Sequence, residues 1–567
     1  MNTRSPRPLI RLALAAALAA AVFPALARAA PRDELLRLVP DDVAFCLVVQ
    51  DLRQHSQALA ASPFAEAFRK SPFAAGFKDS PEFKKLAQLD AELRKQVGLD
   101  TASIADKLLG DAFVLAYRPN PPGKTNQDQG IFLLRAQDAA GLGDFVERLN
   151  RAQKDSGDLK ELEERRHAGA AYFRRAERKG ENFYYVNGPV LAFSSQEDMV
   201  RQAIERDRKE GSGEPVAAKQ LRLLGADRGL AGLWINPRAF DAEMDRNLEQ
   251  AKGAEAVVQR AFLRYWKALD GVGLALEIEK EARLTLTLRG RTDDLPAAAK
   301  RLLTEAARPS EAADRFPEDA LLTVAGRLDP AALLDMLADF QTKEARAALA
   351  EALERGFGAP SGKDFAKEVL PALGPDFGLC LLAPAGPDKG LVPQGLLAVR
   401  VGSDQGADQA VLSAVDFYAR LAAMSYRGPG KGISLKTLRQ DKVEVKYLAG
   451  EGAFPAGVQP AYALKDGYLV FASSPEALRR FGPAKTSGAV PLLRLSAKAL
   501  SRYLTERREE LVAVVAEKHN LSKDEAARRL DGLLVGLRLL DRVEISQSSE
   551  AGRLSLTLRI QTALPLK

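Results

Sequence analysis

Apolar and polar residues alternate strictly along several short segments of this chain. In residues 268–291, Leu284 and Leu286 fall on one face, and Thr285 and Thr287 fall on the other. Alternation with a period of two is typical of half-buried antiparallel strands, so this segment predicts a β-hairpin. Comparable apolar runs predict strands at 43–50, 112–117, 131–135 and 320–326.

Other segments repeat their apolar residues at spacings of three, four and seven, which indicates amphipathic helices. Helices are predicted at 143–166 and 407–424. A further long helix carries one apolar stripe that we expect to pack on the sheet: Met244, Leu248, Ala251, Val258, Phe262, Tyr265 and Leu269. Hairpin-connected strands with helices beside them define an α+β architecture.

Six segments recur in the same order about 270 positions later. For example, VPDDVAFCLVV at Val39 corresponds to FPEDALLTVAG at Phe316, and RLTLTLRGRT at Arg283 corresponds to RLSLTLRIQT at Arg553. Repeats of this kind indicate an internal duplication. We therefore predict two related α+β repeats, at 30–305 and 306–567. Each is a mainly antiparallel sheet covered by amphipathic helices, and the two could enclose a groove between them.

Residues 1–29 have the order of a Sec-type signal peptide. Three arginines precede the apolar run 12–26, and Ala27 and Ala29 precede a predicted cleavage site. We expect a periplasmic or extracellular protein without a transmembrane span in its mature chain. An uncleaved membrane anchor is the alternative. The segment holds four arginines and no acid, so its removal lowers the formal net charge from +7 to +3. This small charge argues against a nucleic-acid partner.

Residues for familiar catalytic or metal chemistry are scarce. The only histidines are His55, His167 and His519, and no two of them have ligand spacing. We predict no catalytic residue, no metal site and no cofactor. Acid pairs are common and unspecific, so a carboxylate-dependent hydrolase stays open. Cys46 and Cys380 lie in apolar runs, which favours buried thiols, with a disulfide as the alternative.

A basic stretch at 165–185 interleaves arginines with aromatic residues. It has two interpretations. The stretch could bind an acidic polymer or anionic lipid head groups. The favoured interpretation is a hairpin with a charged outer face and with its Tyr and Phe side chains toward the core.

A Ser-Pro pair recurs every nine residues from Ser62 to Pro81, and each pair predicts the start of a helix. Aromatic residues accompany these turns, and they are the predicted ligand- or partner-binding residues: Phe64, Phe68, Phe73, Phe77 and Phe83. They form either a lid over an apolar pocket or docking surface, or simply a cover of the first core.

These Ser-Pro helices, the acidic strand opening at 39–49 and the strands that end in Ser-Ser at 190–195 and 469–474 resemble an uncharacterised family of exported bacterial proteins with a domain of unknown function. The resemblance implies no catalytic residues. The leading interpretation is therefore a non-enzymatic protein of the cell envelope that binds a protein partner or an apolar small molecule. The alternatives are a structural or assembly component of the envelope and the carboxylate-dependent hydrolase.

Overall fold

A computed structural model describes residues 30–119, 129–209, 213–384, 390–402, 406–426, 428, 432–440, 442–483, 491–550 and 552–566. The predicted signal peptide at 1–29 lies outside these residues. The structure is 47% helical and 29% strand, and its strands pair antiparallel, which confirms the α+β fold class.

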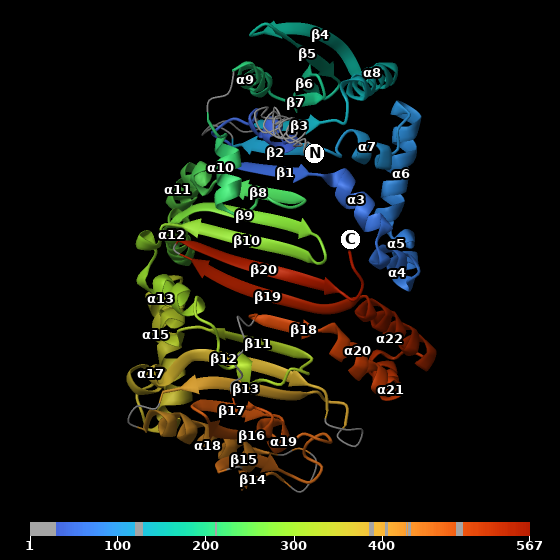
Figure 1. Cartoon of the computed structure of the whole chain (residues 1–567). Helices are drawn as coiled ribbons and strands as arrows, with labels where there is room; N and C mark the ends of the chain where they lie inside the picture. The colour runs from blue at the N-terminus through green and yellow to red at the C-terminus, as the bar shows by residue number, and fades with distance from the viewer. Residues whose placement is uncertain are drawn as a thin grey trace, which may run out of the picture.

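Twenty strands in the described part of the chain form one continuous antiparallel sheet (Figure 1). From one edge to the middle, the order is β4 (Leu159–His167), β5 (Ala170–Glu177), β6 (Gly180–Asn187), β7 (Val190–Ser194), β3 (Gln129–Arg135), β2 (Ala112–Arg118), β1 (Phe45–Gln50), β8 (Ala231–Ile235), β9 (Leu269–Ile278) and β10 (Ala282–Gly290).

From the middle to the other edge, the order is β20 (Arg553–Thr562), β19 (Leu540–Glu550), β18 (Leu493–Ser496), β11 (Leu322–Arg327), β12 (Leu373–Leu382), β13 (Gln394–Val401), β17 (Tyr468–Ala472), β16 (Ala461–Lys465), β15 (Val443–Ala449) and β14 (Ser434–Gln440). This order mirrors that of the first ten strands, with every strand number raised by ten. A duplication would produce this arrangement, although the duplication itself and the repeat boundaries stay predictions.

The two sets of strands join edge to edge through β10 and β20. Eight residue pairs connect these strands. Hydroxyl groups also hydrogen-bond across the seam, Thr285 to Thr557 at 3.1 Å and Thr287 to Ser555 at 3.2 Å. The expected groove between the halves is therefore replaced by continuous sheet.

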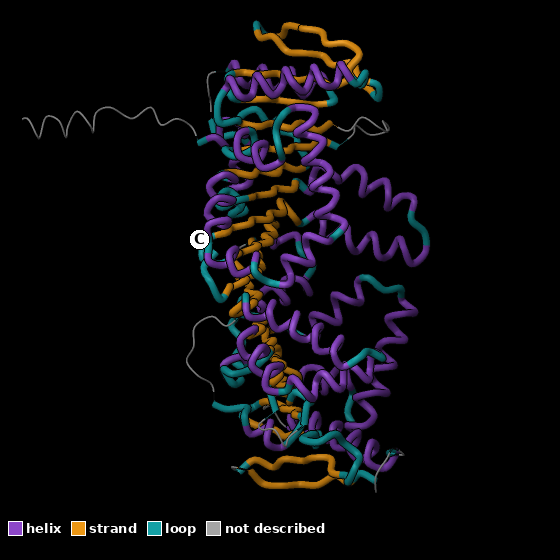
Figure 2. Tube along the Cα trace, turned by 90° about the vertical axis from the view of Figure 1, so that its right-hand side faces the viewer, coloured by secondary structure: helices purple, strands orange, loops and turns teal. Residues whose placement is uncertain are grey.

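Helices lie along both sides of the elongated stack of strands (Figure 2). At one end of the central strands (right in Figure 1) are α3 (Leu52–Ala61), α4 (Pro63–Arg69), α5 (Pro72–Asp79), α6 (Pro81–Val97), α20 (Ala497–Glu506), α21 (Arg508–His519) and α22 (Lys523–Arg538). At the other end are α11 (Asp241–Gln250), α12 (Gly253–Lys267), α13 (Ala297–Ala306) and α15 (Lys343–Leu353). Helix α10 (Val216–Leu223) instead crosses one face of the sheet.

The two largest buried cores lie on the same face of the sheet. In the first, Cys46 and Val48 of β1 share a cluster with α2 (Pro31–Leu36), α9 (Glu197–Arg208) and α10. In the second, Cys380 of β12 and Ala398 of β13 share a cluster with α19 (Pro475–Arg479). Each set of ten strands therefore has its own core, as two related units would.

The Ser-Pro pairs start helices as predicted. The hydroxyls of Ser62, Ser71 and Ser80 each accept a hydrogen bond from the backbone N–H three residues later, at 3.1, 3.4 and 3.2 Å. Proline occupies the first position of α4, α5 and α6. A cap and a preset proline φ together favour a new helix start at each point.

The helix predicted at 143–166 is wrong in its second part. Helix α8 (Ala139–Asp155) ends before Gly157, whose φ of +75° is left-handed, and the remaining residues form β4. Arg174 of β5 lies 3.2 Å from Glu163 and 3.4 Å from Glu161 across the hairpin. Cross-strand charge pairs of this kind stabilise the strand in place of the helix that these residue types favour locally.

The prediction of one long helix with an apolar stripe from Met244 to Leu269 is also wrong. This segment is broken into α11 and α12, because Gly253 has a φ of +58°, and Leu269 starts β9. Val258 and Phe262 of α12 are exposed instead of packing on the sheet.

Candidate functional site

The central strands carry a continuous row of apolar side chains on one face of the sheet. Directly paired residues of antiparallel strands point to the same face, so the strand register defines the row. We call it the leucine face: Leu115, Leu47, Leu233, Leu274, Leu276, Leu284, Leu286, Leu556, Leu558, Ile545, Leu493, Val324, Leu379 and Leu397. It crosses eleven strands from β2 to β13, a distance of about 50 Å at the usual strand spacing.

The central leucines are more exposed than the polar residues behind them. Leu286 of β10 is 36% exposed, whereas the adjacent Thr287 on the opposite face is 1% exposed. Five leucines of the face, one each on β2, β12 and β13 and two on β10, keep 36–39% of their surface in contact with solvent. Exposed apolar side chains that gather on one face are a feature of ligand- and partner-binding surfaces, so this face is the candidate functional site.

Helices cover the same side of the sheet at its two outer parts. Phe113 of β2 and Phe132 of β3 pack with Leu142 of α8 in a separate cluster. Beyond β13, Phe471 packs with Val411 of α18 (Ala407–Ser425). Within the described residues, no buried cluster includes a member of the leucine face. On this side of the sheet, the described helices therefore cover the outer strands and leave the leucine face outside every buried cluster.

The five predicted aromatic residues do not form one cluster. Phe64 and Phe68 stack with ring centroids 6.3 Å apart, and Phe77 and Phe83 meet edge to face at 5.6 Å. Phe73 lies against Gly536 of α22, where an added Cβ would come within 2.8 Å of its ring. Phe73 and Phe77 are 44% and 53% exposed.

These aromatic helices also contact the end of the central sheet. The Phe64 backbone N–H donates to the Pro565 carbonyl at 3.4 Å, just beyond the last residue of β20. Helices α5 and α22 lie against each other. Helices α4 and α5 thus lie beside the end of β20, in the middle of the row of strands, and the binding role of the aromatic residues stays a prediction.

A cavity of about 450 Å³ lies at that same end. Its lining comes from α20, the C-terminus of α22 and the paired ends of β19 and β20: Lys498, Ser501, Leu537, Arg538, Leu540, Asp541, Thr562 and Ala563. Thr562 is on the side of β20 that carries Leu556 and Leu558, because alternate residues of a strand share a face. We call this cavity the end cavity.

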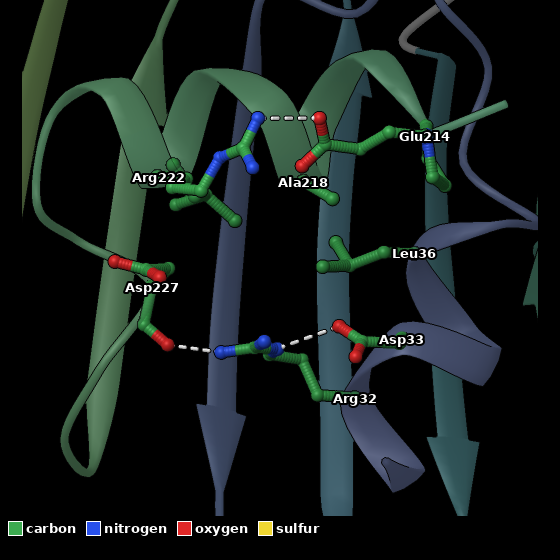
Figure 3. A pocket seen from close by; sticks show the side chains of 9 residues that line it. Arg32, Asp33, Leu36, Glu214, Ala218, Arg222 and Asp227 are labelled. Atoms are coloured by element: carbon green, nitrogen blue, oxygen red, sulfur yellow. Dashed lines mark hydrogen bonds and ion pairs between the residues drawn. The ribbon is translucent and has the colours of Figure 1, made fainter. Parts of the chain in front are cut away.

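A second cavity of about 290 Å³ lies between α2 and α10 (Figure 3). Arg32 forms an ion pair with Asp33 at 3.0 Å and donates to the Asp227 carbonyl. Arg222 pairs with Glu214 at 2.6 Å. Both guanidinium groups are therefore already neutralised, which makes this cavity a weaker candidate for binding a charged ligand.

The basic stretch at 165–185 is the hairpin that its favoured interpretation predicts. Tyr172 and Tyr185 are buried in the first core. Arg165 pairs with Glu197 at 2.9 Å, and Arg174 pairs with several glutamates. Because these arginines already have acidic partners, the surface is unsuited to an acidic polymer.

The carboxyl groups give no support to the hydrolase alternative. A glycosidase-type acid needs a raised pKa so that it is protonated near neutral pH. In the described part of the chain, the resolved carboxyl shifts go the other way. For example, Arg480 lowers the pKa of Asp319, and Arg508 lowers that of Asp531. No group of three or more potential ligands among the described residues could hold a metal ion.

One buried carboxylate, Asp376, has a structural role. It accepts hydrogen bonds from the hydroxyls of Ser310 at 2.6 Å and Tyr468 at 2.5 Å. The backbone N–H groups of Glu311 and Ala312 donate to it at 3.0 Å each. These donors satisfy a charge that would otherwise be costly to bury, and they tie β12 and β17 to the turn before β11.

Cys46 and Cys380 are free thiols buried in separate cores. Burial raises the pKa of each thiol to about 12. They act as small apolar residues, as the favoured interpretation predicts, and a disulfide between them is excluded by this arrangement.

The fold and the site define an α+β protein whose open antiparallel sheet carries an exposed apolar face. Residues 295–481, which extend from α13 to the loop after α19, match the family "Protein of unknown function (DUF3352)". This match confirms the resemblance to an uncharacterised family. No curated protein and no solved structure matches the chain. Across the described ranges, no helix combines the length and apolar character needed to cross a bilayer.

Sequence reasoning placed the leucines of the central hairpin on one face but missed that this face is exposed. The alternation of Leu284 to Thr287 shows which residues share a face and says nothing about which face is covered. For Lys498 and Arg538 of the end cavity, forty positions apart, the sequence contains no signal that would bring them together.

Proposed function

We propose that this protein binds the hydrocarbon chain of a lipid-like amphiphile on its leucine face. The observation that carries the proposal is the reversed exposure of β10, where Leu286 is 36% exposed and Thr287 is 1% exposed. Apolar sheet surface is usually covered in a soluble protein, and exposed patches of several hundred Å² mark binding sites.

The exposed leucines would supply part of the binding energy of such a ligand. Complete burial of a leucine side chain contributes about 1.5–3 kcal/mol, so covering the exposed third adds about 0.5–1 kcal/mol. The two exposed leucines of β10 are neighbours on one strand, and covering both would contribute about 1–2 kcal/mol before the cost of association is subtracted. A hydrocarbon chain spans about 15 Å, half of a bilayer core, so the leucine face has room for more than one.

The neighbouring aromatic helices support an apolar ligand. Phe73 and Phe77 remain exposed on α5, which lies against α22, and they would add apolar contact area near a bound chain. The proposal includes export: the basic, apolar and small-residue segments of 1–29 support binding in the periplasm or outside the cell. Nothing in the proposed role requires chemistry on the ligand.

A protein partner on the leucine face is the competing function. The observation in its favour is length, because about 50 Å of apolar strand surface exceeds one hydrocarbon chain and suits an amphipathic helix. The two functions make different predictions for a free amphiphile. Only a lipid-binding protein should show saturable binding of a free amphiphile to the leucine face.

The test is a titration of the detergent-free mature chain with 1-N-phenylnaphthylamine, an uncharged dye that fluoresces in apolar surroundings. We expect saturable binding that dodecanol displaces, and lipid in an organic extract of protein purified from its native host. Absence of saturable dye binding would overturn the proposal and leave the partner-protein function.

A further inference from the structure

We infer that the end cavity holds the anionic head group of the amphiphile, so that the ligand class is an anionic lipid with a phosphate or carboxylate head. This inference rests on the proposed function. It specifies the chemistry of the ligand and the direction in which the ligand lies on the sheet.

The end cavity is lined by the ends of two strands that carry the leucine face further along. Leu540 and Thr562 pair at the ends of β19 and β20, and both line the cavity. Moving inward on the same face, Ile560 and then Leu558 follow Thr562 on β20. Leu558 lies about 13 Å from Thr562 along the strand, because each residue advances about 3.3 Å. A head group in the cavity would therefore place its chain directly on the leucines.

The charge of the cavity fits an anion. Lys498 of α20 and Arg538 of α22 supply two cations, against one carboxylate from Asp541. Considering the residues that the structure describes, neither cation forms an ion pair within 4 Å, unlike most arginines of this protein. The Ser501 hydroxyl adds a further donor to the lining. Arginine and lysine together are well suited to a phosphate or carboxylate.

The apolar part of the cavity suits the first carbons of the chain. Leu537 of α22 and Leu540 of β19 line it beside the two cations. One residue before Leu537, Gly536 lies against Phe73 of α5, so the aromatic helices border the same junction. The arrangement therefore has a charged end and an apolar continuation, which is the pattern of an amphiphile.

The experiment compares dodecyl phosphate with dodecanol, which share a chain and differ in the head group. Each is used to displace 1-N-phenylnaphthylamine from the full mature chain. We expect dodecyl phosphate to bind at least tenfold more tightly than dodecanol, and the difference to shrink as the salt concentration rises. Equal affinity would overturn the inference and leave the proposed function intact, whereas failure of the dye to bind would remove both.

Two double variants separate the cavity from general surface charge. In K498A/R538A, we expect the preference for dodecyl phosphate over dodecanol to fall to less than threefold. The matched control is K518A/R528A, which removes exposed cations of α21 and α22 outside the cavity lining and should keep the preference. A preference retained in K498A/R538A would overturn the inference.

A final arm distinguishes a lipid head group from a free anion. Inorganic phosphate should compete with dodecyl phosphate for the cavity only weakly. We expect competition to require an inorganic phosphate concentration at least a hundredfold higher than the concentration of dodecyl phosphate. Displacement at comparable concentrations would mean that the cavity binds free phosphate, and the lipid assignment would be wrong.

If K498A/R538A fails to fold, K498Q/R538Q provides the same removal of charge with more of the side chain retained.

Discussion

Substitution of Leu286 by glutamate provides the sharpest test of the leucine face. Leu286 lies on β10, at the seam between the two sets of strands, and is 36% exposed. In the unliganded protein a glutamate carboxylate can reach solvent from this position. We therefore expect the free energy of unfolding to fall by no more than about 1 kcal/mol, as for other partly exposed positions.

Ligand binding should respond much more strongly. The variant loses the apolar contact, worth about 0.5–1 kcal/mol. It must also desolvate or protonate a carboxyl group beneath the bound chain. Protonating a glutamate of ordinary pKa near 4.3 costs about 4 kcal/mol at pH 7, which sets an upper bound. The expected loss therefore lies between about 1 and 5 kcal/mol, so affinity should fall at least fivefold.

The sign of the pH dependence follows from the same argument. Protonation becomes easier as the pH falls, so dye affinity of L286E should recover toward that of the parent between pH 7 and pH 5. Leu286→Ala should show a smaller loss and no such recovery. The assay is dye titration at both pH values, with urea unfolding as the measure of stability.

Leu162→Glu is the matched control. Leu162 is similarly exposed but lies on the edge strand β4, outside the leucine face. Dye binding to L162E should equal that of the parent protein. If L286E binds the dye as tightly as L162E does, the reasoning about the leucine face is refuted.

Three further predictions concern the fold. Asp376→Asn should reduce the free energy of unfolding by about 3 kcal/mol in urea titrations, because the amide cannot accept from all four donors. Cys46 and Cys380 should react with Ellman's reagent only after denaturation; rapid reaction of the native protein would contradict their burial. Stability should fall as the pH drops below about 4, because Asp319 has a lowered pKa in the folded state and contributes only while ionised. Arg480→Met should weaken this acid sensitivity, as measured by thermal unfolding at pH 3 and pH 7.

The sequence predicted much of the fold because many of its signals are local. Each serine of the Ser-Pro pairs accepts a hydrogen bond within its own helix, and proline presets the backbone of the next residue. The alternation of leucine and threonine in β10 likewise follows from the geometry of one strand. Such features require no knowledge of distant segments, and the structure confirms them.

The failures have a nonlocal origin. Residues of β4 favour a helix by composition, but hairpin pairing with β5 and the left-handed Gly157 make them a strand. The exposed leucine face could not be predicted, because it depends on where α8 and α18 stop covering the sheet. Likewise, α20 and α22 bring Lys498 and Arg538 together only in the folded protein.

The seam between β10 and β20 has a consequence for biosynthesis. Residues that hydrogen-bond across it, Thr287 and Ser555, are 268 positions apart. During synthesis, β10 therefore has an unpaired, leucine-rich edge until the second half of the chain has emerged. Such edges recruit other strands and promote aggregation, and contacts of this sequence separation form slowly. A chain that ends after β10 should therefore associate with its own copies through this edge.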